Sequence, residues 1–183
     1  MVKSIDKQTV VEVLCKTLQD STPEVRAKAA ESLGKIASET AVPALVQLLE
    51  DNNNSVRLNV IYALGEIASS AAIPDLVKML LDENQQIRIF TVDTLGKIGS
   101  EKVLTYLFQA LEDESSEVRS TAANALGQIG LEDAIPKLVN ALNDENDTVR
   151  SNIVEAIGKI GESIKCNMSL RGGTTFALRV PEG

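Results

Sequence analysis

Apolar residues follow the spacing of an α-helix through most of the chain, in segments separated by polar turns. Segments such as VPALVQLLED (residues 42–51) and IPDLVKMLLD (residues 73–82) carry apolar residues three and four positions apart, which predicts a helix with one buried face. A second helical segment follows each of them, such as SVRLNVIYALGEIAS (residues 55–69), which repeats the pattern of EVRAKAAESLGKIAS (residues 24–38). The pattern predicts a series of helical hairpins, with second helices near residues 23–38, 54–69, 85–99, 116–130 and 147–161.

These hairpins repeat every 31 residues. An apolar residue followed by arginine marks one position of the repeat, in the pairs Val25-Arg26, Val56-Arg57, Ile87-Arg88, Val118-Arg119 and Val149-Arg150. A glycine marks another, at Gly34, Gly65, Gly96, Gly127 and Gly158. A fixed period of about 20 to 50 residues is typical of stacked repeats. The hydrophobic core is therefore expected to run along a line of stacked units.

Polar residues that favour helix starts precede each second helix. They are Thr22, Asn53, Asn84, Ser115 and Asn146, and each can accept a hydrogen bond from an unpaired backbone N–H in the first turn. Prolines occupy the first turn of three first helices, where the missing N–H costs little: Pro43, Pro74 and Pro136. The first helix between those of Pro74 and Pro136 has Thr105 at this position, so proline is not required.

Several repeat positions are expected to serve packing. Val25, Leu33 and Ile36, with their equivalents, should point inward, and the glycines should lie where neighbouring helices approach closely, because glycine within a helix costs about 1 kcal/mol relative to alanine. Each repeated arginine follows an aspartate by six residues: Asp20, Asp51, Asp82, Asp113 and Asp144. One interpretation of the repeated arginines is a stripe that binds anions. Since every arginine has its own aspartate, we favour an inter-repeat ladder in which arginines bridge carboxylates and loop carbonyls.

The repeat resembles a known family. The pattern D…[TNS]xxVRxxAAxxLGxI, preceded by VPALVxLL, is similar to the short form of the HEAT repeat, found in phycobilisome lyase-like proteins and in many bacterial and archaeal chains. The resemblance covers residues 8–161. It implies an all-α fold, a right-handed α-solenoid (α-α superhelix) of five stacked helical hairpins whose second helices line a concave surface. We expect this domain at residues 1–161 and a non-repeat tail at residues 162–183.

Positions that the fold leaves free are where a repeat protein sets its specificity. Relative to the apolar–arginine pair, these are the next two residues, the residue three further on and the residue after the glycine. The first repeat has Ala27 and Glu31 where the second has Leu58 and Tyr62, so the core does not need those bulky side chains. We therefore predict a partner-binding patch with an apolar centre and a polar rim, formed by Leu58, Asn59, Tyr62, Glu66, Ile89, Phe90, Asp93 and Lys97. The alternative is that the bulky residues fill gaps between second helices, or that Phe90 turns inward.

This patch favours a protein–protein interaction scaffold that binds a protein or peptide on the concave face. Lysine and arginine number 18 against 26 aspartates and glutamates, a net charge of −8, which argues against nucleic acid as the partner. The chain has no apolar run near the length that spans a bilayer and no signal-peptide pattern at its start. We therefore expect no membrane partner and a cytoplasmic location.

The residues offer little for catalysis. The chain has no histidine, so it has no imidazole base and no Ser–His or Cys–His pair. The segment RGGTT (residues 171–175) lacks the lysine and spacing of a phosphate-binding loop. We expect no enzyme activity and no cofactor. The family resemblance adds one alternative, a subunit of a bilin lyase-type (phycobilisome lyase-like) chromophore-handling enzyme, for which no catalytic position can be carried over.

The two ends of the chain depart from the repeat. After Gly161, the glycines at 172–173 and Pro181 prevent the helix that a sixth unit would need. A solenoid needs capped terminal faces, and neither end shows an obvious polar capping helix. We expect either that the repeats belong to a longer protein or that uncapped ends self-associate. Cys15 takes a small hydrophobic position and Cys166 lies outside the repeats. No disulfide between them is expected, because a stretched solenoid places its two ends far apart.

Overall fold

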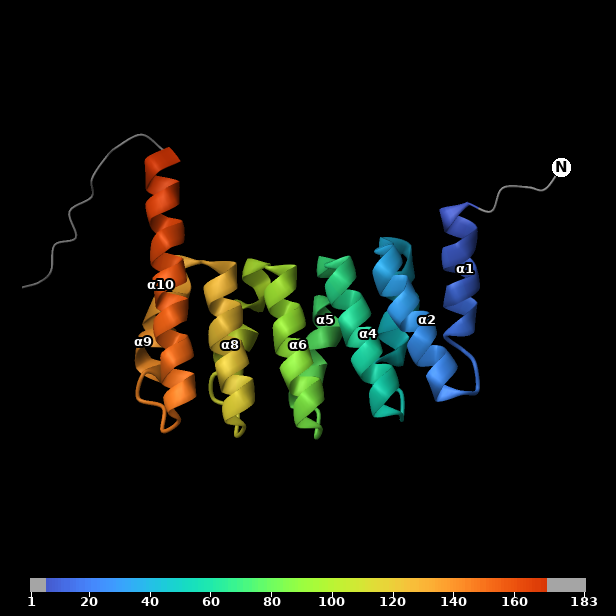
Figure 1. Ribbon diagram of the computed structural model, residues 1–183, viewed down its shortest axis with the longest axis horizontal. Helices are drawn as coiled ribbons and strands as arrows, with labels where there is room; N and C mark the ends of the chain where they lie inside the picture. The colour runs from blue at the N-terminus through green and yellow to red at the C-terminus, as the bar shows by residue number, and fades with distance from the viewer. Residues whose placement is uncertain (1–5, 171–183) are drawn as a thin grey trace, which may run out of the picture.

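The computed structural model describes the backbone of residues 6–170 and the side chains of residues 6–166. Five helical hairpins stack side by side along the long axis of the molecule (Figure 1). The second helix of each hairpin packs against the second helix of the next, so these helices form one row, which we call the second-helix face. The expected fold class is confirmed: the protein is an all-α, right-handed α-solenoid.

The two kinds of helix differ in length. The second helices are α2 (Pro23–Ile36), α4 (Asn54–Ile67), α6 (Gln85–Ile98), α8 (Ser116–Ile129) and α10 (Asp147–Leu170). The first helices are α1 (Lys7–Thr17), α3 (Val42–Val46), α5 (Ile73–Leu76), α7 (Leu104–Ala110) and α9 (Ile135–Ala141). Tighter 3-10 turns precede α3, α5, α7 and α9, at Glu39–Ala41, Ser70–Ala72, Glu101–Val103 and Glu132–Ala134, and others follow α3 and α5, at Gln47–Glu50 and Val77–Leu81.

Two side chains at the start of the second helices accept hydrogen bonds from backbone N–H groups: that of the N-cap residue, where it is asparagine, and that of an aspartate two residues earlier. Asn53, Asn84 and Asn146 accept hydrogen bonds from first-turn N–H groups, as predicted. Thr22 and Ser115 occupy the N-cap position but make no capping hydrogen bond, so the prediction is wrong for these two. At all five starts, the aspartate two residues earlier accepts the N–H of the N-cap residue at 2.8–2.9 Å, which fixes the turn.

The ends of four second helices share a left-handed residue. Ala37 and Ala68 have φ of 50° and 53°, and Gly99 and Gly130 have φ of 65° and 71°. Gly161 occupies the same position in the last repeat, but α10 continues through it to Leu170. The expected helix end near residue 161 is therefore wrong, because no proline follows before residue 170 and Gly161 stays helical. Residues 171–183 of the predicted tail lie outside the described residues.

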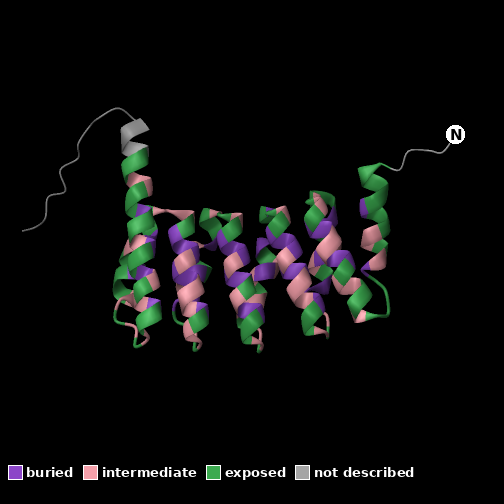
Figure 2. Ribbon diagram, in the orientation of Figure 1, coloured by how far each residue is buried: buried purple, intermediate pink, exposed green. Residues whose placement is uncertain are grey.

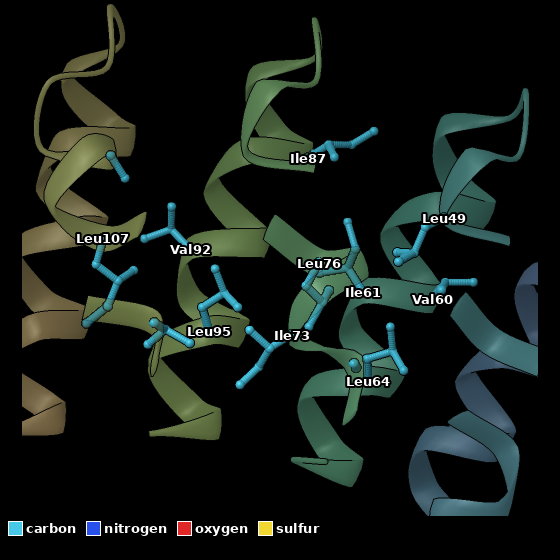
Figure 3. Close-up of a cluster of buried hydrophobic side chains, with 14 of the residues drawn as sticks. Leu49, Val60, Ile61, Leu64, Ile73, Leu76, Ile87, Val92, Leu95 and Leu107 are labelled. Atoms are coloured by element: carbon cyan, nitrogen blue, oxygen red, sulfur yellow. The ribbon is translucent and has the colours of Figure 1, made fainter. Parts of the chain in front are cut away.

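The core is a continuous line of aliphatic side chains between the two rows of helices (Figures 2 and 3). Repeats one to four each contribute a buried leucine from their second helix, at Leu33, Leu64, Leu95 and Leu126. In repeats two to five the first helix adds another, at Leu45, Leu76, Leu107 and Leu138. Val25 departs from its expected inward position and is 38% exposed, since no earlier repeat covers it, whereas its four equivalents are buried.

The repeated glycines mark the closest approach between second helices, as predicted. A Cβ added at Gly34 would lie 2.8 Å from the Cα of Ala63, and one added at Gly127 would lie 2.8 Å from the Cα of Ala156. These distances are shorter than any normal carbon contact, so only glycine fits. A Cβ at Gly158 would meet no atom within 4 Å.

The expected arginine–aspartate ladder connects each repeat to the next. Arg26 donates through Nε and Nη2 to the carboxylate of Asp51 at 2.8 and 2.9 Å, and through Nη1 to the carbonyl of Asp20 at 2.8 Å. The other carboxylate pairs are Arg57–Asp82, Arg88–Asp113 and Arg119–Asp144. Arg57 forms the weakest of them, with its closest Nη2–carboxylate distance at 3.2 Å and its Nε buried without a hydrogen bond. The ladder is structural, which excludes the anion-stripe interpretation.

Acid is expected to weaken this ladder. Hydrogen bonds from Arg26 and Arg119 hold the pKa values of Asp51 and Asp144 below their ordinary value of 3.8. A carboxylate with a lowered folded pKa contributes stability that is complete above its unfolded pKa and is lost as the pH falls through the folded pKa. The difference in free energy of unfolding between wild type and Asp51→Asn should therefore shrink as urea titrations move from neutral pH to below 3.8. A difference independent of pH would contradict this account.

Candidate partner-binding site

The second-helix face carries a hollow of about 470 Å³ over the last three repeats. Three helices line it side by side (Figure 1). Its lining residues are Ile89, Phe90 and Asp93 from α6, Thr121, Asn124, Ala125 and Gln128 from α8, and Asn152, Glu155 and Lys159 from α10. We call this the α6–α10 hollow.

The hollow is formed mainly by the repeat positions that the fold leaves free. Phe90, Thr121 and Asn152 are equivalent, as are Asp93, Asn124 and Glu155, and Gln128 and Lys159 form a third row. Residues three and four apart lie on one face of a helix, so each helix presents one short stripe. Neighbouring stripes lie side by side because successive second helices pack against each other.

The hollow combines one aromatic surface with polar groups. Phe90 is 39% exposed. Within residues 6–166, the side-chain amides of Asn124 and Gln128 make no hydrogen bond in the structure, which leaves their donors and acceptors available. The two carboxylates are paired: Lys97 Nζ lies 3.1 Å from Asp93, and Lys159 Nζ lies 2.6 Å from Glu155. The site is therefore polar, amide-rich and nearly neutral beside one apolar ring.

The eight predicted patch residues fall into separate groups. Ile89, Phe90 and Asp93 meet in the hollow, and Lys97 joins them through its ion pair with Asp93. The other four lie on α4: Leu58, Asn59, Tyr62 and Glu66. None of these four lines the α6–α10 hollow; Asn59 lines a second, smaller hollow of about 270 Å³ between α2 and α4.

The bulky residues of the predicted patch are not equally exposed. Leu58 and Ile89 are partly buried and pack against the core, which agrees with the gap-filling alternative for these two. Tyr62 is partly buried, Glu66 is exposed, and Phe90 does not turn inward. The exposed apolar surface near the hollow is thus smaller than the sequence suggested and centres on Phe90.

Sequence reasoning missed the polar half of the hollow. The missed residues are Thr121, Asn124, Gln128, Asn152, Glu155 and Lys159. All six occupy the variable repeat positions, so the signal was present in the repeat alignment. The prediction did not reach them because it placed the patch around the bulky residues of repeats two and three, and these six residues belong to repeats four and five.

Other kinds of site find no support within the described part of the chain. Among residues 6–166, no group of three or more His, Cys, Asp or Glu side chains is placed to hold a metal ion. No helix between residues 6 and 170 has the length and apolar character needed to cross a membrane. Cys15 is partly buried against the core, and this burial raises the pKa of its thiol. Cys15 and Cys166 are both free.

The stacked hairpins and shared second-helix face define an α-solenoid repeat protein. The family model for HEAT repeats matches residues 11–88 and 76–158, which together span most of the chain. The chain therefore belongs to the HEAT-repeat family. A search of curated protein sequences gives no match.

Solved structures share this fold. The complex of CpcE and CpcF of phycocyanin lyase from Nostoc sp. PCC7120 matches with a TM-score of 0.71 and 23% identity, covering 98% of this chain and 76% of that one. A designed armadillo repeat protein in complex with the peptide (KR)4 matches with a TM-score of 0.64 and 23% identity, covering 84% and 82%. An engineered protein matches with a TM-score of 0.59 and 24% identity, covering 88% and 85%. At these identities the likeness concerns the fold alone.

Proposed function

We propose that the protein is a non-catalytic interaction scaffold that binds an extended peptide segment of a partner protein in the α6–α10 hollow. The observation that carries this proposal is that exposed Phe90 on α6 lines one hollow with Asn124 and Gln128 on α8, whose amides make no hydrogen bond among residues 6–166. None of these three side chains belongs to the buried core. The fold therefore does not dictate these three residue types, and they can serve binding. We place the scaffold in the cytoplasm, since free cysteines suit a reducing compartment.

The chemistry of the hollow suits an extended backbone. A side-chain amide both donates and accepts hydrogen bonds, as does each peptide unit of an extended chain. Phe90 offers a surface for one apolar side chain of the ligand, in the manner of an anchor beside polar contacts. The acidic groups Asp93 and Glu155 are already neutralised by lysines, so the ligand need not be strongly basic. The designed armadillo neighbour, which has a similar fold, was solved in complex with a peptide, (KR)4, and this supports a peptide as the class of ligand.

Selection from a random peptide library tests the proposal. Wild-type protein should enrich peptides with a shared apolar residue, and a Phe90→Ser, Asn124→Ala double variant used as counter-target should not retain them. Thermal unfolding of the variant in parallel should match wild type, because both side chains lie outside the core. Peptides that bind both proteins equally would contradict the proposed site.

A role as a subunit of a bilin lyase-type enzyme is the second candidate. The CpcE–CpcF match, which covers 98% of this chain, favours it, although it carries no catalytic residue across. Mixing the protein with a bilin and an apo-phycobiliprotein, alone and with candidate partner subunits, should change the bilin absorbance if this role holds. An unchanged spectrum in every mixture would contradict it.

A further inference from the structure

The two ends of the solenoid expose repeat positions that are buried in the repeats between them. Val154 at the C-terminal end is 61% exposed, whereas its equivalents are fully buried: Ala30, Ile61, Val92 and Ala123. Val10 at the N-terminal end is 39% exposed, whereas its equivalents are also fully buried: Ala41, Ala72, Val103 and Ala134. Val25, also in the first repeat, is 38% exposed, whereas its equivalents in the later repeats are buried. Each end therefore presents one half of the interface that joins neighbouring repeats.

The repeated glycines show the same difference. Four of them abut a residue of the following repeat: Gly34, Gly65, Gly96 and Gly127 face Ala63, Thr94, Ala125 and Ala156 in that order. Gly158 is exposed, with nothing within 4 Å of an added Cβ. Ser32 occupies the facing position in the first repeat and is partly exposed. The C-terminal end thus carries Gly158 without a small residue packed on it. The N-terminal end carries Ser32 without a glycine to pack on.

The arginine–aspartate ladder also ends in complementary halves. Arg150 donates to the carbonyls of Asp144 and Glu145 at 2.7 and 3.0 Å, but to no carboxylate within the described residues. Asp20 accepts the N–H of Thr22 at 2.8 Å, but no arginine within the described part of the chain pairs with its carboxylate. The C-terminal end therefore offers the cation, and the N-terminal end the anion, of one further ladder pair.

We propose that the C-terminal end of one molecule binds the N-terminal end of a second copy through the contacts that join neighbouring repeats. In the continued 31-residue register, Asp20 of the second copy pairs with Arg150, and Ser32 of the second copy packs on Gly158. Val154 is then covered by the copy's first hairpin. A second copy is the occupant because the end requires an aspartate and a small residue at this spacing, and the opposite end of the same chain supplies both.

The interface is heterologous, so each molecule keeps one end free after binding. Such contacts produce open assemblies unless the rotation closes a ring. Association should therefore grow steadily with concentration instead of stopping at a dimer. In the assembly, the second-helix face continues from one molecule to the next, which lengthens the surface available to a bound peptide.

Sedimentation velocity of the full chain over a wide concentration range tests this proposal. The weight-average sedimentation coefficient should rise with concentration for wild type. Arg150→Glu and Asp20→Arg should each weaken association at least about tenfold, because like charges then meet. An equimolar mixture of the two variants should recover association, since opposite charges face each other again. This recovery also excludes misfolding as the cause of the loss.

Two further variants sharpen the experiment. Leu81→Asp adds a negative charge at a residue that is 89% exposed and lies far from both ends, so it should associate like wild type. Gly158→Ala should weaken association, since its Cβ meets Ser32 of the second copy, even though alanine favours the helix of the separate molecule. A wild-type protein that stays monomeric at every concentration, or charge variants that associate like wild type, would overturn the proposal.

Discussion

Replacing Arg88 with methionine is expected to lower the free energy of unfolding by about 3 kcal/mol. The guanidinium donates to both carboxylate oxygens of Asp113, at 2.9 and 3.0 Å, and to the carbonyl of Asp82 at 2.9 Å. The arginine side chain is only 8% exposed and that of Asp113 only 13%. Methionine preserves the packing of the stem, so the loss comes from a poorly solvated carboxylate that no longer has its cation. Urea unfolding at neutral pH measures this change.

Arg150→Met is the matched control. Arg150 occupies the same repeat position but bonds only to loop carbonyls within the described residues. Its replacement should cost about 1 kcal/mol or less, because it leaves two loop carbonyls without a donor but no carboxylate without its cation. Equal losses for the two variants would show that the arginine stabilises its own turn and that the connection between repeats contributes little.

Gly127→Ala is expected to lower the free energy of unfolding by about 2 kcal/mol, the cost of overpacking a close interface. The new Cβ would lie 2.8 Å from the Cα and 3.0 Å from the Cβ of Ala156. Neither atom belongs to a flexible side chain, so α8 and α10 must move apart. This separation also loosens the neighbouring core. Thermal and urea unfolding both measure the effect.

Gly158→Ala provides the opposite expectation at the equivalent position. No atom lies within 4 Å of the added Cβ, and residue 158 is within α10. Alanine should therefore raise the free energy of unfolding by up to about 1 kcal/mol at concentrations where the protein is monomeric. If both substitutions destabilise equally, the close approach at Gly127 is not the reason for its glycine.

The fold could be predicted from the sequence because its determinants are local and repeated. The glycine and arginine positions recur without a slip, and in repeats one to four each marks a contact with the next repeat. The end of α10 could not be predicted in this way. Gly99 and Gly130 end their helices in the left-handed conformation, while Gly161 occupies the same position and stays helical. Glycine permits both conformations, so the residues that follow decide between them.

The candidate site was predictable only in part. The variable positions of the repeat line the α6–α10 hollow, and the sequence identified those positions. Their exposure depends on how deeply each side chain packs between neighbouring helices. Leu58 and Ile89 occupy the same position and pack against the core, whereas Phe90, the next residue, remains exposed. The exposure of each side chain depends on the distance between neighbouring second helices. The repeat pattern of a single sequence does not predict this distance.

Isothermal titration of a selected peptide into two aromatic variants tests the binding site most directly. Phe90 on α6 is 39% exposed and Tyr106 on α7, in the row of first helices, is 36% exposed, so the two substitutions to serine remove similar surface from different faces. The account predicts that Phe90→Ser weakens binding at least about tenfold and that Tyr106→Ser binds like wild type, with both variants equally stable. Equal affinities for the two variants, or a loss confined to Tyr106→Ser, would contradict a partner site on the second-helix face.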